Sequence, residues 1–149
     1  TLPKIFPNGN PEPGNYCAPV YFNGVVYFGP LNDTIQGFSL TNGLLSTSAT
    51  LRSSETFPDR GAAISISSNG ATANGILWAV QRNATSPGDL RAYDLSSSGG
   101  GQLHEIYNSD QAGSRDTLGV AAKFVSPVVA NGRVFVGGTA QLTVYGLLP

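Results

Sequence analysis

Short runs of apolar residues at alternate positions, separated by tight polar turns, recur along this chain. In the segment 126–146, two such runs flank Asn131-Gly132 and a third follows Gly137-Gly138. Asn-Gly between two alternating apolar runs is the strongest local signal for a two-residue β-hairpin. The pattern therefore predicts three antiparallel strands joined by short turns.

The same layout occurs twice more, nearer the N-terminus. In 18–38 the runs flank Asn23-Gly24, and in the more diverged segment 62–95 the second run follows Asn74-Gly75. The glycines of the three turns are separated by 51 and 57 residues. A period near 50 residues built from four short strands is typical of a β-propeller blade. Because no helical period persists for three turns, we expect almost no helix.

The repeats predict an all-β chain of about three propeller blades, each of four antiparallel strands. Because closed rings use roughly four to eight blades, we expect these blades to belong to a larger propeller or to be completed by other copies of the chain. The blades are predicted over 15–51, 62–109 and 121–149, joined by connectors over Arg52–Gly61 and Asp110–Val120. The outer strands of the first two blades are predicted over Leu44–Leu51 and Gln102–Tyr107, and the last repeat has no outer strand. An exposed hairpin loop is predicted over Ser96–Gly101.

Residues 1–14 have a different composition, with four prolines and two glycines. Such a segment is incompatible with a helix or a central strand, so only Leu2–Phe6 is expected to pair, as an edge strand. The chain contains no methionine. We therefore expect Thr1 to follow an upstream segment rather than to be the translated start.

Charge and composition exclude several classes of partner and site. Charged residues make up 11% of the chain, eight basic against nine acidic, with no basic run, so nucleic acid is not an expected partner. No apolar run approaches the ~18 residues of a membrane helix. One cysteine, Cys17, and one histidine, His104, are too few for a disulfide or a zinc cluster. Cys17 and the single tryptophan, Trp78, are expected in the core, and His104 on an exposed outer strand.

Several stretches of the chain resemble pyrroloquinoline-quinone-like repeat propellers, and in particular the last blades of secreted bacterial members. The resemblance covers nearly everything after Asn15. It implies a propeller fold and a secreted, extracellular or periplasmic location. The stretches are APVYFNGVVYFG, IQGFSLTNGLLSTS, GILWAV, LRAYDL, YNSDQAGSRDTLGVAAKF and SPVVANGRVFVGGTAQLTVYGLL.

The chain departs from the motif that closes each blade in enzymatic quinoproteins, A-x-D-x-x-T-G-x-x-x-W, whose Trp docks on the next blade. The first copy, 37–46, lacks both the Asp and the Trp. The second copy keeps Ala92-Tyr93-Asp94-Leu95 but continues into SSSGGG without a Trp. We therefore expect other groups to pack the blades together.

The resemblance implies, for an active member, a carboxylate base, an arginine near the quinone and usually a calcium ion. Arg115 and Asp116 could fill the first two roles, although an adjacent pair of this kind is more often a structural clamp. Lys123 is a third candidate for ligand binding. The sequence has no calcium loop and no Gly-x-Ser-x-Gly elbow, so no catalytic residue and no metal ligand is assigned. Asn32 and Asn83 match the N-glycosylation pattern, which applies if the protein is eukaryotic.

These features favour a non-enzymatic extracellular binding or structural module without a cofactor, whose partner is a protein or glycan at the propeller face. The first alternative is the C-terminal part of a quinone-dependent alcohol or sugar dehydrogenase, which would need pyrroloquinoline quinone and calcium. The second is an extracellular assembly subunit whose open sheet edges pair between chains. The absence of the docking Trp and of a calcium loop favours the binding module over the dehydrogenase.

Overall fold

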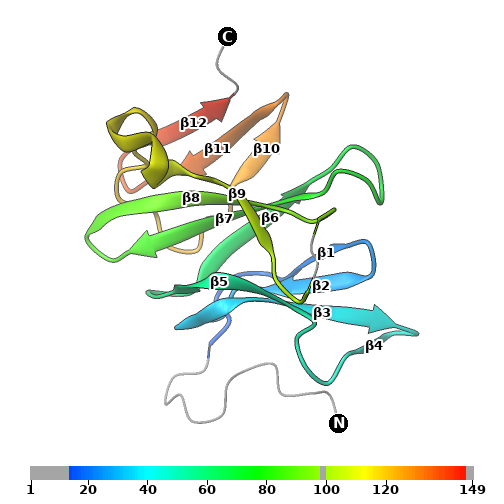
Figure 1. Cartoon of the computed structure of the whole chain (residues 1–149). Helices are drawn as coiled ribbons and strands as arrows, with labels where there is room; N and C mark the ends of the chain where they lie inside the picture. The colour runs from blue at the N-terminus through cyan, green and yellow to red at the C-terminus, as the bar shows by residue number, and fades with distance from the viewer. Residues whose placement is uncertain (1–13, 98–99, 147–149) are drawn as a thin grey trace.

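Strands make up most of the chain, and the prediction of an all-β protein is confirmed. The computed structural model describes residues 14–97 and 100–146, so the edge strand predicted at Leu2–Phe6 and the last three residues lie outside the described part. The strands form three antiparallel sheets that follow one another along the chain (Figure 1). Each sheet corresponds to one of the three predicted repeats.

Within each sheet, successive strands pair with their sequence neighbours, except that β5 of sheet 1 pairs with β3 instead of β4. Sheet 1 contains β1 (Val20–Phe22), β2 (Val25–Phe28), β3 (Asp33–Thr41), β4 (Leu44–Leu45) and β5 (Leu51–Phe57); sheet 2 contains β6 (Ala62–Ser67), β7 (Ile76–Asn83), β8 (Ser86–Asp94) and β9 (His104–Asn108); and sheet 3 contains β10 (Val128–Ala130), β11 (Arg133–Gly137) and β12 (Leu142–Gly146).

The Asn-Gly turns set the register of the first hairpins of sheets 1 and 3. Asn23 and Gly24 have φ angles of 45° and 80°, and Asn131 and Gly132 have 48° and 70°. Two successive positive φ angles define the type I′ turn, whose twist matches that of the flanking strands. This local geometry explains why both hairpins could be read from the sequence.

The outer strand of sheet 1 is not where the sequence predicted it. A further Asn42-Gly43 turn leads into β4, which is only two residues long, and the chain then returns to β3 as β5. The outer strand is thus Leu51–Phe57, so the predictions of a strand over Leu44–Leu51 and of a connector from Arg52 were wrong. In sheet 2, the outer strand predicted over Gln102–Tyr107 is β9, shifted by up to two residues.

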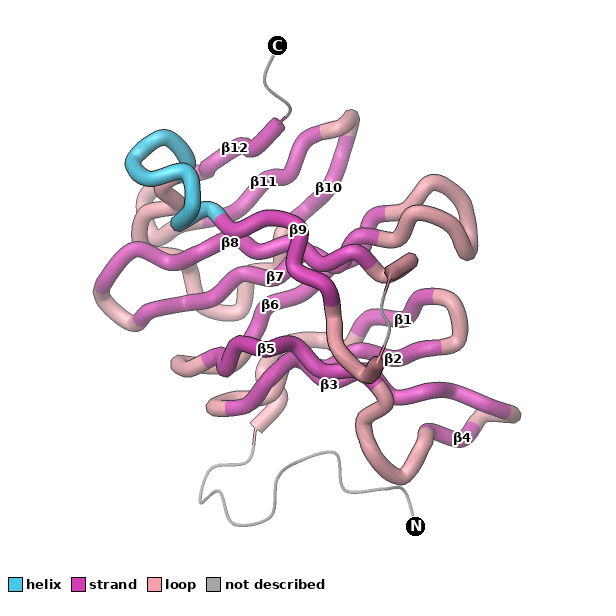
Figure 2. The backbone as a smooth tube through the Cα atoms, viewed as in Figure 1, coloured by secondary structure: helices cyan, strands magenta, loops and turns pink. Residues whose placement is uncertain are grey.

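Within the described part of the chain, a 3₁₀ helical segment, kinked at Gly113, interrupts the all-β pattern. The 3₁₀ helix η1 (Ser109–Asp116) connects β9 to sheet 3, where the sequence predicted an irregular connector and almost no helix (Figure 2). Its first turn is capped by Asn108, whose side-chain oxygen accepts a hydrogen bond from the backbone N–H of Asp110. No helix in residues 14–97 and 100–146 is long and apolar enough to cross a membrane.

The three sheets are stacked face to face, with sheet 2 in the middle and both of its faces buried. Along β7, Leu77 and Ala79 belong to the core between sheets 1 and 2, whereas Val80 belongs to the core between sheets 2 and 3, against which Trp78 also packs. Successive side chains of a strand point to opposite faces, so one strand supplies both cores.

The first strands of the three sheets lie together, because β6 contacts both β1 and β10. Ala62 donates its backbone N–H to the carbonyl oxygen of Gly29 at 3.2 Å, which joins β6 to the end of β2. On the outer side, the backbone N–H of Arg52 donates to the carbonyl oxygen of Gly101 at 2.9 Å. The carbonyl oxygen of Arg52 accepts from the backbone N–H of Leu103 at 2.8 Å. Sheets 1 and 2 are therefore joined near both their inner and outer strands, and the stack of the described residues does not close on itself.

Candidate functional site

A cleft of about 610 Å³ lies between sheets 2 and 3. Most of its wall is apolar, and polar groups are concentrated where η1 ends. The cleft is lined by Ser67, Ile76, Trp78 and Tyr107 from sheet 2, by Arg115 and Asp116 from η1, and by Val129, Gly132, Val134, Thr143, Val144, Tyr145 and Gly146 from sheet 3 and its first turn.

Three aromatic side chains with fixed positions form its walls. The indole Nε1 of Trp78 donates to Oγ of Ser67 at 2.9 Å, which orients the ring from β7. The rings of Tyr107 and Tyr145 stand edge to face, with centroids 6.4 Å apart and planes at 70°. The sequence predicted Trp78 as core, and the structure makes it half-buried, with part of its surface in the cleft.

Arg115 and Asp116 meet at the rim of this cleft and bind each other in a bidentate ion pair. Nε and a terminal nitrogen of Arg115 lie 2.7 and 2.9 Å from the two carboxylate oxygens of Asp116. Tyr107 donates its hydroxyl to the same carboxylate at 2.7 Å, and Tyr145 donates to the backbone oxygen of Asp116 at 3.1 Å. The geometry is that of a clamp, because it fastens the end of η1 to β9 and β12.

The same contacts shift the titration of the clamp. The Arg115 guanidinium, together with the Tyr107 hydroxyl, lowers the pKa of Asp116 to about 2. Burial and the neighbouring Asp116 carboxylate raise the pKa of Tyr107. The Arg115–Asp116 pair thus carries no net charge, and the low pKa of Asp116 makes its carboxylate a weak base for proton abstraction.

The other residues singled out in the sequence lie away from the cleft lining. Lys123 is exposed in a turn before β10, and His104 is exposed on β9. Asn32 is exposed between β2 and β3, whereas the amide of Asn83 donates to the carbonyl oxygen of Pro87 at 2.9 Å and to Asp89 at 3.3 Å. A glycan on Nδ2 of Asn83 would replace one of its two amide hydrogens and so remove at least one of these hydrogen bonds. Cys17 is half-buried against the core between sheets 2 and 3.

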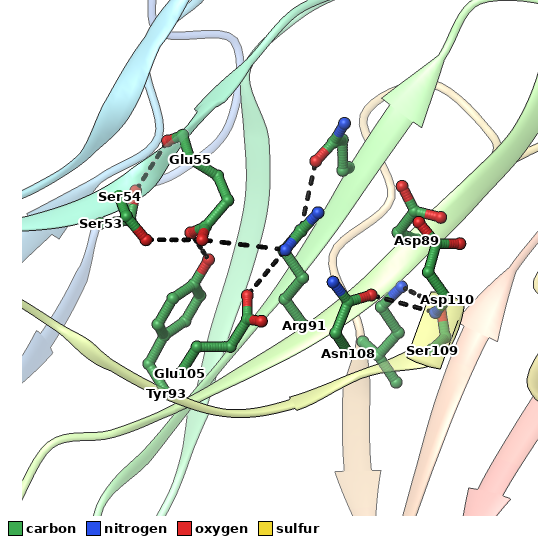
Figure 3. Close-up of polar contacts among 12 residues, drawn as sticks. Ser53, Ser54, Glu55, Asp89, Arg91, Tyr93, Glu105, Asn108, Ser109 and Asp110 are labelled. Carbon is green, nitrogen blue, oxygen red and sulfur yellow. Dashed lines mark hydrogen bonds and ion pairs between the residues drawn. The ribbon is translucent and has the colours of Figure 1, made fainter. Parts of the chain in front are cut away.

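Sequence reasoning missed a polar cluster that joins sheets 1 and 2. Arg91 of β8 donates to Glu105 of β9 at 2.7 Å and lies 4.0 Å from Glu55 of β5, while Tyr93 donates its hydroxyl to Glu55 at 2.8 Å (Figure 3). Burial would raise the pKa of Glu55, but hydrogen bonds from Ser54 and Tyr93 outweigh it and lower that pKa. The cluster is a charge-paired joint between sheets, not a set of free reactive groups.

A second missed pair, Asp89 and Asp110, lies where η1 begins (Figure 3). Asp89 is only 6% exposed, and burial together with the Asp110 carboxylate raises its pKa to about 6. The adjacent Leu90 donates its N–H to Oγ of Ser109 at 3.0 Å, which holds η1 against β8. No local motif marks this pair, because its members are 21 positions apart and meet only through the fold.

The Arg115–Asp116 pair does not fit the calcium-binding part of the site that the family resemblance implies. Both carboxylate oxygens of Asp116 are engaged by Arg115 and one also by Tyr107. Within 14–97 and 100–146 no group of three or more histidine, cysteine, aspartate or glutamate side chains could hold a metal ion. Asp116 therefore belongs to no described group of carboxylates that could hold a calcium ion.

Comparison with known proteins adds no identity. No family model matches this chain, and neither a curated protein nor a solved structure matches it.

Proposed function

We propose that this chain is a non-enzymatic binding module, built of propeller-type blades and exported from the cell, which holds a protein or glycan partner in the cleft between sheets 2 and 3. The single observation that carries the proposal is the composition of this cleft. Trp78, Tyr107 and Tyr145 supply rigid aromatic surface, and the two charged side chains among the described lining residues, Arg115 and Asp116, neutralise each other. Such a site suits contact with an apolar or ring-shaped surface rather than with an ion.

The repetition of side-chain directions supports the propeller part of the proposal. Phe22 and Tyr27, one residue before and three residues after the turn in sheet 1, face sheet 2. Ala130 and Phe135 hold the same places in sheet 3, on its face away from sheet 2. Val128 on that face is 60% exposed. A further blade would cover this face as sheet 2 covers sheet 1, so we expect a larger propeller or completion by other copies.

The test uses Trp78, the only tryptophan in the chain, as a reporter of the cleft. The probes are anilinonaphthalene sulfonate, an aromatic apolar anion, and a short cello-oligosaccharide. We expect at least one probe to change Trp78 emission with a single-site isotherm. The variant Ile76→Glu places a charge in the cleft wall and should weaken binding, whereas the matched variant Val128→Glu, on the exposed face of sheet 3, should not.

Two results would overturn this function. Probe binding that is unaffected by Ile76→Glu would show that the probes do not use the cleft. Dye reduction at enzymatic rates after addition of pyrroloquinoline quinone and Ca²⁺ would favour the dehydrogenase alternative instead. Circular dichroism of each variant establishes that the sheets remain folded in these comparisons.

A further inference from the structure

Among the described residues, the outer edge of sheet 3 has no counterpart of the outer strand found in sheets 1 and 2. In sheet 1, β5 pairs antiparallel with β3, and in sheet 2, β9 pairs antiparallel with β8. The equivalent strand of sheet 3 is β12, which pairs with β11 and with no other strand of the described residues. Sheet 3 therefore presents an open edge along Leu142–Gly146.

Equivalent positions show which backbone groups this edge exposes. Phe38, Tyr93 and Tyr145 each pair inward, with Val26, Leu77 and Val134, respectively. The residue before Phe38 is Gly37, whose carbonyl oxygen accepts from Thr50 at 2.8 Å on the outer side. Val144 holds the place of Gly37. Because hydrogen-bonding directions alternate along an antiparallel strand, the N–H and C=O groups of Leu142, Val144 and Gly146 point to the open edge.

The cleft lies directly beside this open edge. Thr143 and Tyr145, on the face of β12 toward sheet 2, line it, and Tyr107 of β9 stands opposite them. On the other face of the same strand, Leu142 and Val144 are 64% and 44% exposed. A strand added to β12 would direct alternate side chains into the cleft and the others to the side of Leu142 and Val144. The side chains of the added strand would therefore meet an apolar surface of this protein on both faces of the sheet.

We propose that the edge of β12 and the adjoining cleft bind an extended, apolar segment of a partner protein as a fourth, antiparallel strand of sheet 3. This inference rests on the proposed function, because it names the kind of partner that the cleft holds. Main-chain hydrogen bonds supply the affinity, and the aromatic wall of the cleft selects apolar side chains. The neutral Arg115–Asp116 clamp requires no charge on the segment.

The probe is a synthetic peptide with the sequence of residues 24–29, GVVYFG, which contains the apolar strand β2. The whole protein is titrated with it while Trp78 emission and the hydrogen exchange of the Val144 and Gly146 amides are measured. We expect both amides to exchange more slowly. A control peptide, N-methylated at alternate backbone nitrogens, keeps every side chain and should bind about tenfold or more weakly, the effect of losing two hydrogen bonds.

Variants of the protein test the same edge from the other side. Val144→Pro removes an outward N–H without removing a bond to β11, and should abolish the protection of Gly146 by the peptide. If this variant does not fold, Val144→Lys keeps the backbone and places a charge of the kind that blocks natural sheet edges. Val128→Lys, on the same face but on the inner strand, is the matched control and should bind the peptide as the parent protein does.

Each other outcome overturns the inference in a distinct way. Equal binding of the N-methylated peptide would mean that side chains alone are recognised. If the Val144 amide exchanges slowly without peptide, and the protein sediments as a dimer, then the β12 edge is occupied by a second copy of the chain. Loss of peptide binding while anilinonaphthalene sulfonate still enters the cleft would remove strand addition and leave the proposed function intact. Failure of every probe would remove both.

Discussion

The hydroxyl of Tyr107 donates a 2.7 Å hydrogen bond to the carboxylate of Asp116, and so joins the outer strand of sheet 2 to the last residue of η1. Arg115 and this phenol together lower the pKa of Asp116 to about 2. Because the folded-state pKa lies below the ordinary value, Asp116 contributes stability that is present above about pH 4 and is lost as the pH falls through about 2.

Replacing Tyr107 by phenylalanine should therefore cost stability in a pH-dependent way. The variant Tyr107→Phe keeps the ring and loses one charge-assisted hydrogen bond, so we expect the free energy of unfolding to fall by about 1–2 kcal/mol near neutral pH and by less in acid. Urea unfolding at several pH values measures it. Tyr145→Phe is the control, because the Tyr145 hydroxyl donates to the backbone oxygen of Asp116, which does not titrate. The free energy of unfolding lost in this variant should not depend on pH. Equal pH dependence in both variants would contradict this account.

Asp89 should act on stability in the opposite direction. Burial and the Asp110 carboxylate raise its pKa to about 6, so its contribution is fully present below about pH 4 and is lost as the pH rises through about 6. Asp89→Asn keeps the shape and cannot ionise. We expect the variant to gain stability relative to the parent protein between about pH 4 and pH 8, as measured by thermal unfolding.

Asp110→Asn is the matched control for that pair. It leaves Asp89 ionisable but removes the neighbouring carboxylate that, after burial, raises its pKa. It should therefore reproduce part of the gain at neutral pH. If the difference in stability between the parent protein and each variant does not change with pH, then Asp89 and Asp110 do not interact in solution.

The close approach of β6 to the end of β2 predicts a strong effect of a single methyl group. A Cβ at Gly29 would overlap the backbone oxygen and side chain of Ala62, so Gly29→Ala should destabilise the protein by about 1–3 kcal/mol. Gly146→Ala is the control, since its Cβ would lie 3.6 Å from Cγ of Arg133, an ordinary contact. Denaturant midpoints give both values, and similar values would contradict the packing of sheet 1 on sheet 2.

Cys17 offers a clean test of the core between sheets 2 and 3. Burial raises the pKa of its thiol, and the thiolate is the reactive form. We expect a thiol reagent such as iodoacetamide to modify native protein near pH 8 much more slowly than protein in urea. Because Cys17 is the only cysteine, intact mass reports the reaction directly. Equal rates would mean that this thiol is free in the folded state.

Part of the candidate site could be predicted from the sequence. Arg115 and Asp116 were singled out as an adjacent ion pair, and the structure places both at the cleft rim. Lys123, chosen from the same region, lies in an exposed turn instead. The aromatic walls could not be foreseen, because Trp78, Tyr107 and Tyr145 come from three strands in two sheets and become neighbours only when the sheets stack.

The sequence by itself determined the strands that are defined by short-range signals. Asn-Gly turns fix a hairpin within four residues, and alternation of apolar side chains fixes which face is buried, so sheet 3 and the first hairpin of sheet 1 were predicted correctly. The tertiary structure decided the rest. β5 carries few apolar residues and was missed, because it is held partly by Ser53, whose Oγ accepts from the N–H of Ile35. The pairs Asp89–Asp110 and Glu55–Arg91 likewise depend on contacts between separate elements, and no local pattern encodes such contacts.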